Sequence, residues 1–319
     1  MFREISVVVP VFNSCDTLPD LVERIIASLQ AIATRFEIIL VDDNSGDGSR
    51  DVILLLGEQY KTVQPLLLMR NFGQHSALLA GIREAQFPVT ITLDDDLQNP
   101  PEEIPKLLQK LEEGYDVVYG TPLATRQDLW RLLASKITRL ALSTTVGARL
   151  APIVSPFRAF RTDIRSAFAD YFAPFVCIDV LLTWGTQRFA TVSVRHDARA
   201  RGRSNYSFEK LVVHAMNMMT GFSSWPLRFA SIVGFAFTFV GLAILVYVVG
   251  RYFIAGGSVP GFPFLASIIA IFSGAQLFAL GVIGEYLGKI HFRSMNRPPY
   301  VIDRRALPEL HPMAPERSG

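Results

Sequence analysis

The stretch of sequence that decides the fold is residues 89–102, which read VTITLDDDLQNPPE. The apolar, β-branched run Val89–Leu93 predicts a buried strand, and the prolines and acids after the acidic triplet predict the first turn of a helix. Upstream, Ile5–Val9 and Glu37–Val41 are runs of the same kind, and Leu18 to Ala33 between them carries apolar residues at helical spacing. We therefore predict an α/β fold with a mostly parallel sheet and helices on both of its faces.

The acidic triplet at the end of the predicted strand is a candidate metal site. Asp94 and Asp96 flank Asp95, and alternate residues of a strand point the same way, so these two carboxylates can share one divalent cation. Gln98 can add a carbonyl oxygen. Hard oxygen ligands suit Mg²⁺ or Mn²⁺ holding a diphosphate. An acidic triplet alone is more often a solvated loop, but the position of this one after an apolar strand favours the metal site.

A second pair of acids, Asp42 and Asp43, follows the predicted strand Glu37–Val41. Their carboxylates can accept hydrogen bonds from a nucleotide base or ribose. The alternative is that Asp43 or Ser45 only caps the next helix. Ligands of parallel sheets bind at the carboxyl ends of the strands, so two acidic strand ends in one sheet favour a nucleotide-diphosphate site.

Composition excludes several classes of protein. Half of the 319 residues are hydrophobic and 19% are charged, which is unlike a disordered or coiled-coil chain. The mean hydropathy of +0.29 favours a membrane segment. A net charge of +2 argues against binding of nucleic acid by phosphate neutralisation. The two cysteines form no CxxC pair, and the signatures of dinucleotide-binding proteins, P-loop NTPases and HExxH metalloproteases are absent from the sequence.

Two uncharged stretches, Phe229–Gly250 and Phe262–Gly284, predict a membrane hairpin. Each is long enough as a helix to cross a hydrocarbon core of about 30 Å. Arg251 and a turn-rich segment separate them. The alternative is a pair of buried core helices, although core helices rarely lack every charge over such a length.

Basic residues predict the orientation of this hairpin. They cluster in 195–210 and after the second apolar stretch, whereas the hairpin loop has only Arg251. The positive-inside rule then places both termini and the globular part in the cytoplasm, with no signal peptide before the first strand. Residues 206–221 have an amphipathic pattern, which predicts either an interfacial helix or an ordinary helix packed on the globular part.

The expected organisation therefore has four parts. They are a cytoplasmic catalytic domain (1–205), an amphipathic juxtamembrane segment (206–228), the two-helix hairpin (229–284) and a basic cytoplasmic tail (285–319).

Motifs along nearly the whole chain resemble one enzyme family. The chain is similar to membrane-anchored family 2 glycosyltransferases that load a sugar onto a polyprenyl phosphate. Such enzymes include dolichyl-phosphate mannose synthase, bactoprenol glucosyltransferases and the undecaprenyl-phosphate formamidoarabinose transferase. The matching stretches are 7–13 (VVVPVFN), 41–45 (VDDNS), 70–77 (RNFGQHSA), 93–102 (LDDDLQNPPE), 204–208 (SNYSF), 226–228 (PLR) and 280–288 (LGVIGEYLG).

The resemblance implies a GT-A fold, an inverting transfer and three sets of binding residues. The implied donor-binding residues are Pro10, Phe12, Asn13, Asp42, Asp43, Arg70, Asp94 and Asp95. The implied ligands of Mg²⁺ or Mn²⁺ are Asp94, Asp96 and Gln98. The implied contacts to the lipid phosphate are Arg126, Arg158, Arg199 and Arg203, since a planar guanidinium pairs two phosphate oxygens. Among all of these, Asp94, Asp96, Arg126 and Arg199 are the implied catalytic residues.

The resemblance also implies the partners. They are a nucleotide-sugar (a UDP-sugar rather than a GDP-sugar), a polyprenyl phosphate such as undecaprenyl phosphate, the bilayer of a bacterial inner membrane, and further copies of the chain in a homo-oligomer. The basic run 195–203 can also be a cytoplasmic flank attracted to anionic lipid, and both roles can hold together.

The sequence departs from the family pattern at three positions. Ser14 stands where the family has an acid, Pro156 where it often has an aspartate, and Asn205 where it has a lysine. The first change weakens the assignment of the donor pocket, and the second removes a candidate base. The third removes a phosphate contact that Arg203 can replace. A phosphomonoester has a second pKa of about 6, so the acceptor is already largely ionised at neutral pH, and we expect activity without the base.

Two other functions fit parts of the pattern. Processive polysaccharide synthases share the donor motifs but carry a Gln-x-x-Arg-Trp motif and more spans, whereas here Phe189 follows Gln187 and Arg188. A non-catalytic protein that binds nucleotide-sugar or scaffolds a membrane complex would explain the three departures, but it has less need of a metal site.

Overall fold

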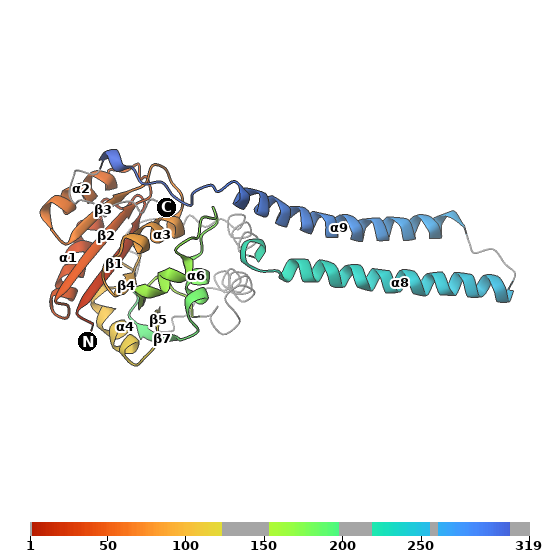
Figure 1. The fold of residues 1–319 in the computed structure, drawn as a ribbon, viewed down its shortest axis with the longest axis horizontal. Coiled ribbons are helices and arrows are strands. Elements are labelled where there is room, and N and C mark those ends of the chain that lie inside the picture. The colour runs from red at the N-terminus through yellow and green to blue at the C-terminus, as the bar shows by residue number, and fades with distance from the viewer. Residues whose placement is uncertain (1, 123–152, 198–218, 256–260, 307–319) are drawn as a thin grey trace, which may run out of the picture.

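The computed structural model describes residues 2–122, 153–197, 219–255 and 261–306, and Figure 1 shows a globular part from which two long helices project. The globular part contains a seven-stranded sheet of strand order β3-β2-β1-β4-β6-β5-β7. The strands are β1 (Glu4–Val11), β2 (Arg35–Asp42), β3 (Val63–Leu67), β4 (Val89–Thr92), β5 (Val117–Pro122), β6 (Arg158–Arg161) and β7 (Phe189–Val194).

The sheet is mostly parallel, which confirms the predicted α/β class. Strands β1, β2, β3 and β4 pair in parallel, as do β5 and β7, whereas β6 runs antiparallel to both β4 and β5. Because β1, β2 and β4 are parallel neighbours, their carboxyl ends meet at one edge of the sheet. The two acidic strand ends that the sequence singled out are therefore brought together.

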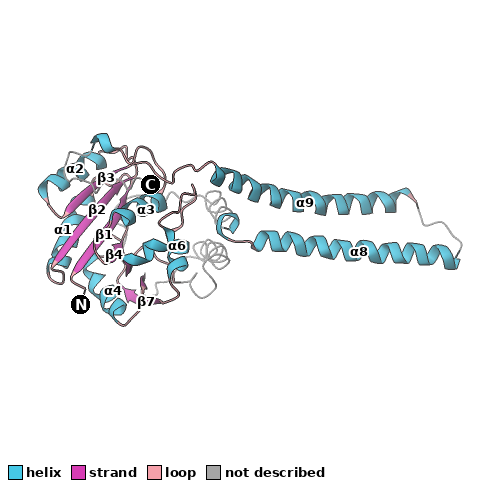
Figure 2. Cartoon of the chain, viewed as in Figure 1, coloured by secondary structure: helices cyan, strands magenta, loops and turns pink. Residues whose placement is uncertain are grey.

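Helices cover both faces of the sheet, as predicted (Figure 2). One face packs against α1 (Leu18–Gln30), α2 (Ser49–Gln59) and α4 (Ile104–Glu112). The other packs against α3 (Gln74–Glu84) and α6 (Ile178–Gly185). With both faces covered, every residue of β1 from Ile5 to Val11 is buried, which explains its nearly continuous apolar sequence.

Helix α3 lies unusually close to the sheet because Gly81 has no side chain. A Cβ atom at this position would overlap Val8 Cγ1 and Val41 Cγ2 on strands β1 and β2. The close approach matters for the site, because α3 begins at Gln74, directly after the loop that borders the pocket described below.

The two projecting helices are α8 (Trp225–Ala255) and α9 (Phe262–Ser294), which pack side by side (Figure 1). Edge-to-face contacts join Phe237 to Phe272 and Phe229 to Phe278, with ring centroids 5.6 and 6.3 Å apart. Within them, Trp225–Gly250 and Ile271–Ser294 are long and apolar enough to cross a membrane. Both helices extend beyond the uncharged stretches that predicted them. The predicted interfacial helix falls mostly within 198–218, outside the described residues.

After α9 the chain returns to the globular part. The Met69 N–H donates to the Val301 carbonyl at 2.9 Å, and the Asp303 N–H donates to the Leu67 carbonyl at 2.8 Å. Ile302 thereby lies opposite Leu68 in an antiparallel bridge beside β3. Part of the predicted basic tail is thus attached to the edge of the sheet.

Candidate active site

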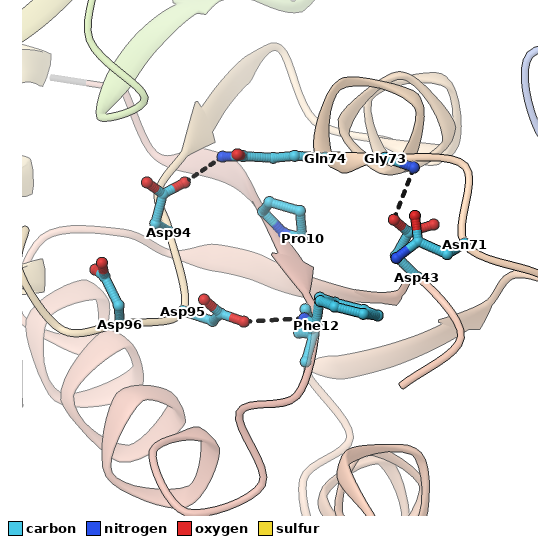
Figure 3. Close-up of a pocket in the computed structure, with 10 residues that line it drawn as sticks. Pro10, Phe12, Asp43, Asn71, Gly73, Gln74, Asp94, Asp95 and Asp96 are labelled. Atoms are coloured by element: carbon cyan, nitrogen blue, oxygen red, sulfur yellow. Dashed lines mark hydrogen bonds between the residues drawn. The ribbon is translucent and has the colours of Figure 1, made fainter. Parts of the chain in front are cut away.

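A cavity of about 240 Å³ opens at the carboxyl ends of β1, β2 and β4 (Figure 3). Four of its lining residues are carboxylates. The lining residues are Pro10, Val11, Phe12, Asp43, Asn71, Gly73, Gln74, Asp94, Asp95 and Asp96. Six of the residues implied by the resemblance lie here together. Sequence reasoning assigned no role to Val11, Asn71, Gly73 and Gln74, although three of these lie in the quoted 70–77 motif.

The acidic triplet divides into two kinds of carboxylate. Asp94 and Asp96 project to one side of the chain, and Asp95 turns toward Phe12 (Figure 3). Asp95 Oδ2 accepts hydrogen bonds from the Phe12 N–H at 3.1 Å and the Ser14 hydroxyl at 2.6 Å. Burial raises the pKa of Asp95, against the opposing effect of these hydrogen bonds. Asp95 therefore holds the loop after β1 in place, and its predicted contact with the donor stays a prediction.

The hydrogen bond between Ser14 and Asp95 bears on the first departure from the family pattern, the serine at position 14. Ser14 supplies a hydroxyl that donates to the Asp95 carboxylate. An acid at position 14 would instead set two carboxylates within hydrogen-bonding distance of each other. Ser14 is thus compatible with an intact pocket.

Asp43 anchors the loop on the other side of the pocket. Its two carboxylate oxygens accept the Phe72 and Gly73 N–H groups at 2.7 and 2.8 Å. Burial raises the pKa of Asp43, partly offset by the two hydrogen bonds. Gly73 has a φ of 93°, a backbone conformation that favours glycine.

Asp42 is buried beneath the pocket edge. One of its oxygens accepts the Ser45 N–H at 3.0 Å. The other, Oδ2, is buried without a hydrogen-bond partner among the described residues. The capping alternative is wrong, because α2 begins at Ser49 after Gly48 and has no side-chain cap from Asp43 or Ser45.

Asn13 joins the loops that follow β1 and β2. Its N–H donates to Ser45 Oγ at 3.0 Å, and its Oδ1 accepts the Gly46 N–H at 2.9 Å. Nearby, Asp47 accepts the Ser49 hydroxyl and N–H and the Cys15 N–H. Burial opposes ionisation of Asp47, but these hydrogen bonds outweigh it and lower the pKa to about 2. Asn13 does not line the cavity, so its predicted donor contact stays a prediction.

Gln74 reaches across the cavity to the metal-site candidate. Its Nε2 donates to Asp94 Oδ1 at 2.7 Å (Figure 3). This hydrogen bond fixes the orientation of the Asp94 carboxylate. The sequence indicated a role for Gln74 only through its position in the 70–77 motif.

Arg70 and Gln98 border the site without lining the cavity. The Arg70 guanidinium stacks on the Phe72 ring, 4.3 Å from its centroid, and the Arg70 side chain is exposed. The Gln98 N–H donates to Asp96 Oδ1 at 3.1 Å, and its carbonyl accepts the Asp197 N–H at 2.9 Å.

Arg158 lies in the core, where a contact with a lipid phosphate is not favoured. It is 1% exposed, its Nε donates to Thr92 Oγ1 at 2.9 Å, and its guanidinium pairs with Asp179. Burial alone lowers the pKa of Arg158, but the Asp179 carboxylate raises it on balance. The Thr92 hydroxyl in turn donates to the Pro156 carbonyl at 2.8 Å. Arg158 thus ties the end of β4 to α6.

A second group of residues carries side chains of the kind that bind metals, and their ligand atoms lie within 4.8 Å of one another. The group consists of His75, Cys177 and Asp179. Asp179 is already paired with Arg158 and accepts the Tyr119 hydroxyl at 2.9 Å. Burial and the Asp179 charge raise the pKa of Cys177 to about 12, so it is a thiol. A cation here would face the Arg158 charge. Asp94 and Asp96 are therefore the better candidates for a metal site, since they are hard oxygen donors that line the open cavity.

The remaining predicted residues, Arg126, Arg199 and Arg203, lie outside the described residues, as does Asn205.

Comparison with known proteins identifies the family. The family model described as "Glycosyl transferase family 2" matches residues 6–172. The chain is similar to the undecaprenyl-phosphate 4-deoxy-4-formamido-L-arabinose transferase of Photorhabdus laumondii, with 38% identity over 306 residues covering 95% of this chain and 94% of the relative. The protein of the same name from Pseudomonas aeruginosa is 36% identical over 321 residues, covering 99% and 94%.

Solved structures share the fold. Glucosyl-3-phosphoglycerate synthase of Mycobacterium tuberculosis superposes with a TM-score of 0.51 at 18% identity, covering 68% of this chain and 78% of that one. The same enzyme in complex with Mn²⁺, UDP-glucose and phosphoglyceric acid gives a TM-score of 0.50 at 18% identity and the same coverage. These similarities confirm the GT-A fold. The family model and the relatives at 36–38% identity show that the chain belongs to glycosyl transferase family 2.

Proposed function

We propose that this protein is an inverting, metal-dependent glycosyltransferase that moves a sugar from a nucleotide-sugar onto a polyprenyl phosphate at the cytoplasmic face of a bacterial inner membrane. One observation carries the proposal. One cavity at the strand ends is lined by Asp43, Asp94 and Asp96, and the chain that contains it matches undecaprenyl-phosphate sugar transferases over nearly its full length.

The walls of the cavity suit a nucleoside. Phe12 is 50% exposed and offers a ring face for a base, and the Asp43 carboxylate, which lines the cavity, is a hydrogen-bond acceptor. A base N–H or a ribose hydroxyl satisfies such an acceptor. UDP is the nucleotide we propose, because the structural neighbour was solved with UDP-glucose.

Asp94 and Asp96 would hold Mg²⁺ or Mn²⁺, and the predicted third ligand is Gln98. When bound, the ion compensates the negative charge of the departing nucleoside diphosphate. Gln74 keeps the Asp94 carboxylate oriented toward the cavity. These residues would thereby hold the diphosphate of a nucleotide-sugar in the cavity.

The transfer is a single displacement. A phosphate oxygen of the lipid forms the new bond to the anomeric carbon, and the bond from that carbon to the diphosphate oxygen breaks with its electron pair on the leaving group. The acceptor phosphate is largely ionised at neutral pH, so Pro156 in place of an acid does not remove a required base. Alignment and charge compensation are needed instead, and Arg126, Arg199 and Arg203 are the proposed sources of positive charge.

Helices α8 and α9 would carry the enzyme in the bilayer where its long-chain acceptor resides. Large apolar side chains along both are exposed, for example Phe235 at 68% and Leu277 at 69%, as expected of surfaces that face lipid. Association into a homo-oligomer remains a prediction.

The test is a transfer assay with the purified full-length protein in detergent. It is incubated with Mg²⁺ or Mn²⁺, undecaprenyl phosphate and a mixture of UDP- and GDP-sugars that includes UDP-4-deoxy-4-formamido-L-arabinose, the sugar in the names of the relatives. Mass spectrometry should find one lipid phosphate bearing one sugar, dependent on metal. A ladder of sugars would identify a polymerising synthase, and UDP binding without any product would identify a non-catalytic binding protein.

A further inference from the structure

The segment after α9 pairs with residues 67–69, at the carboxyl end of β3, the terminal strand of the sheet. An unpaired edge of this kind presents free N–H and C=O groups. Here the two backbone hydrogen bonds from Met69 to Val301 and from Asp303 to Leu67 satisfy such groups at the carboxyl end of the edge. In Figure 1 the chain from α9 passes over the side of the globular part that carries β3 and α2. We call residues 300–303 the return strand.

Side chains fix both ends of the return strand. Asp303 pairs with Arg50 of α2 at 2.7 Å, and this hydrogen bond lowers the pKa of Asp303. At the other end, the Arg83 guanidinium of α3 lies 5.7 Å from the Tyr300 ring centroid and donates to the Tyr171 carbonyl at 2.8 Å. The return strand is therefore tied to two helices on opposite faces of the sheet.

The residues that the return strand pairs with lead directly into the donor pocket. Leu68 donates its N–H to the Asp42 carbonyl at 2.9 Å, so 67–69 is held between β2 on one side and the return strand on the other. Met69 then precedes the 70–73 loop, whose Asn71 and Gly73 line the cavity and whose backbone N–H groups at 72 and 73 bind Asp43. The loop is thus fixed from inside by Asp43 and from outside by the return strand.

We propose that the return strand is a positioning element of the nucleotide site, and that through it the end of the apolar hairpin sets the geometry of the 70–73 loop. This inference rests on the proposed function in that the cavity is taken as the nucleotide site. Arg50 and Asp303 are positioning residues on this view, since neither lines the cavity.

The experiment uses full-length variants in detergent. Arg50→Glu places two acids opposite each other, Asp303→Pro removes the N–H that donates to Leu67, and Arg50→Glu with Asp303→Arg restores the ion pair in reverse. Val301→Ala is the matched control, because it keeps the backbone hydrogen bonds. UDP affinity is measured by calorimetry with Mg²⁺, KM is measured for donor and acceptor separately, and amide hydrogen exchange is followed at 67–73.

We expect Arg50→Glu and Asp303→Pro to raise the Kd for UDP and the donor KM by three- to tenfold, with the acceptor KM unchanged. Exchange at Phe72 and Gly73 should accelerate, and the reversed pair should restore both properties. Unchanged UDP affinity, or exchange that accelerates at Leu67 and Met69 but not at Phe72 and Gly73, would show that the return strand only covers the sheet edge.

The outcome also separates this inference from the proposed function. If the wild-type protein binds no UDP, the proposed nucleotide site is wrong. Exchange at Phe72 and Gly73 in the variants then still decides whether the return strand controls the loop. Asp303→Pro can also lower the melting temperature. Arg50→Glu is the control for this effect, because it leaves the backbone of the return strand intact.

Discussion

Asp94, Asp95 and Asp96 are chemically identical neighbours with different surroundings. Asp95 turns toward the loop that follows β1 and is hydrogen-bonded to it, whereas Asp94 points toward Gln74 (Figure 3). The triplet follows β4, which ends at Thr92, and Asp95 and Asp96 lie in a turn, so loop contacts rather than the alternation of a strand set the three carboxylates apart. Their roles should therefore separate in mutants.

Asp96→Asn should lower the turnover number by about a hundredfold or more while leaving the melting temperature unchanged, because an amide is a weaker ligand for Mg²⁺ than a carboxylate. Asp95→Asn should do the reverse in part: it should lower the melting temperature and retain Mn²⁺ binding. Turnover, melting temperature and Mn²⁺ titration check both variants. Wild-type turnover of Asp96→Asn, or of the wild type in EDTA, would contradict the metal assignment.

The pair of Arg158 and Asp179 is a second residue-scale test. Each charge is buried, so removal of one leaves the other uncompensated, and Arg158→Ala or Asp179→Asn should destabilise the protein by about 3–5 kcal/mol. The double variant Arg158→Met with Asp179→Leu should recover most of this stability. Chemical denaturation measures the structural role of Arg158, and the acceptor KM measures any contact with the lipid phosphate. A stable double variant with a strongly raised acceptor KM would restore Arg158 to the lipid-phosphate site.

At the scale of elements, strands with a continuous apolar run could be predicted, and β3 and β6, which lack one, could not. Ile5–Val9, Glu37–Val41 and Val89–Leu93 correspond to β1, β2 and β4 because burial on both faces requires continuous apolar runs. Strand β3 contains Pro65, and β6 reads Arg-Ala-Phe-Arg, so neither has such a run. Both are recognisable only from their neighbours in the sheet.

The site divides in the same way. The acids were predictable because they follow recognisable strands whose carboxyl ends must meet. Their hydrogen-bond partners were not, because Asp43 binds backbone N–H groups of a loop and Asp95 binds Phe12 and Ser14 more than 80 residues earlier. Such contacts depend on loop conformations, which periodicity does not encode.

Helix α3 offers a test of packing at this scale. Gly81→Ala should destabilise the protein by about 1–3 kcal/mol and raise the Kd for UDP, because the added methyl group pushes α3 and its first residue, Gln74, from the sheet. Gly46→Ala is the control, since a Cβ there meets nothing within 4 Å. Denaturation midpoints and calorimetry provide the measurements. Equal stability of the two variants would mean that the sheet relaxes around the methyl group.

At the scale of the whole molecule, the globular part and the apolar hairpin are connected twice. The chain leaves toward α8 and comes back after α9 to pair with β3. The globular part is therefore assembled from two separate stretches of sequence. A protein cut before α8 would lack the return strand as well as the hairpin.

Deletion of 229–284 with the following residues retained should leave UDP binding intact and abolish transfer to undecaprenyl phosphate in vesicles, because a long-chain acceptor must be reached within the bilayer. Transfer to a short, water-soluble prenyl phosphate should persist. Calorimetry and product mass spectrometry measure the two activities. A full rate with the long-chain acceptor in vesicles would show that the hairpin is not needed for its delivery.

The late position of the return strand also sets an order for biosynthesis. The ribosome completes β7 at Val194, then makes both apolar helices, and only afterwards releases Ile302 to pair with Leu68. At about 5–20 residues per second, the interval is on the order of five to twenty seconds. If the hairpin enters the membrane during that interval, the nascent chain finishes its sheet only after insertion. A chain that stalls before insertion would then leave residues 67–69, at the end of β3, without their backbone partners in the return strand.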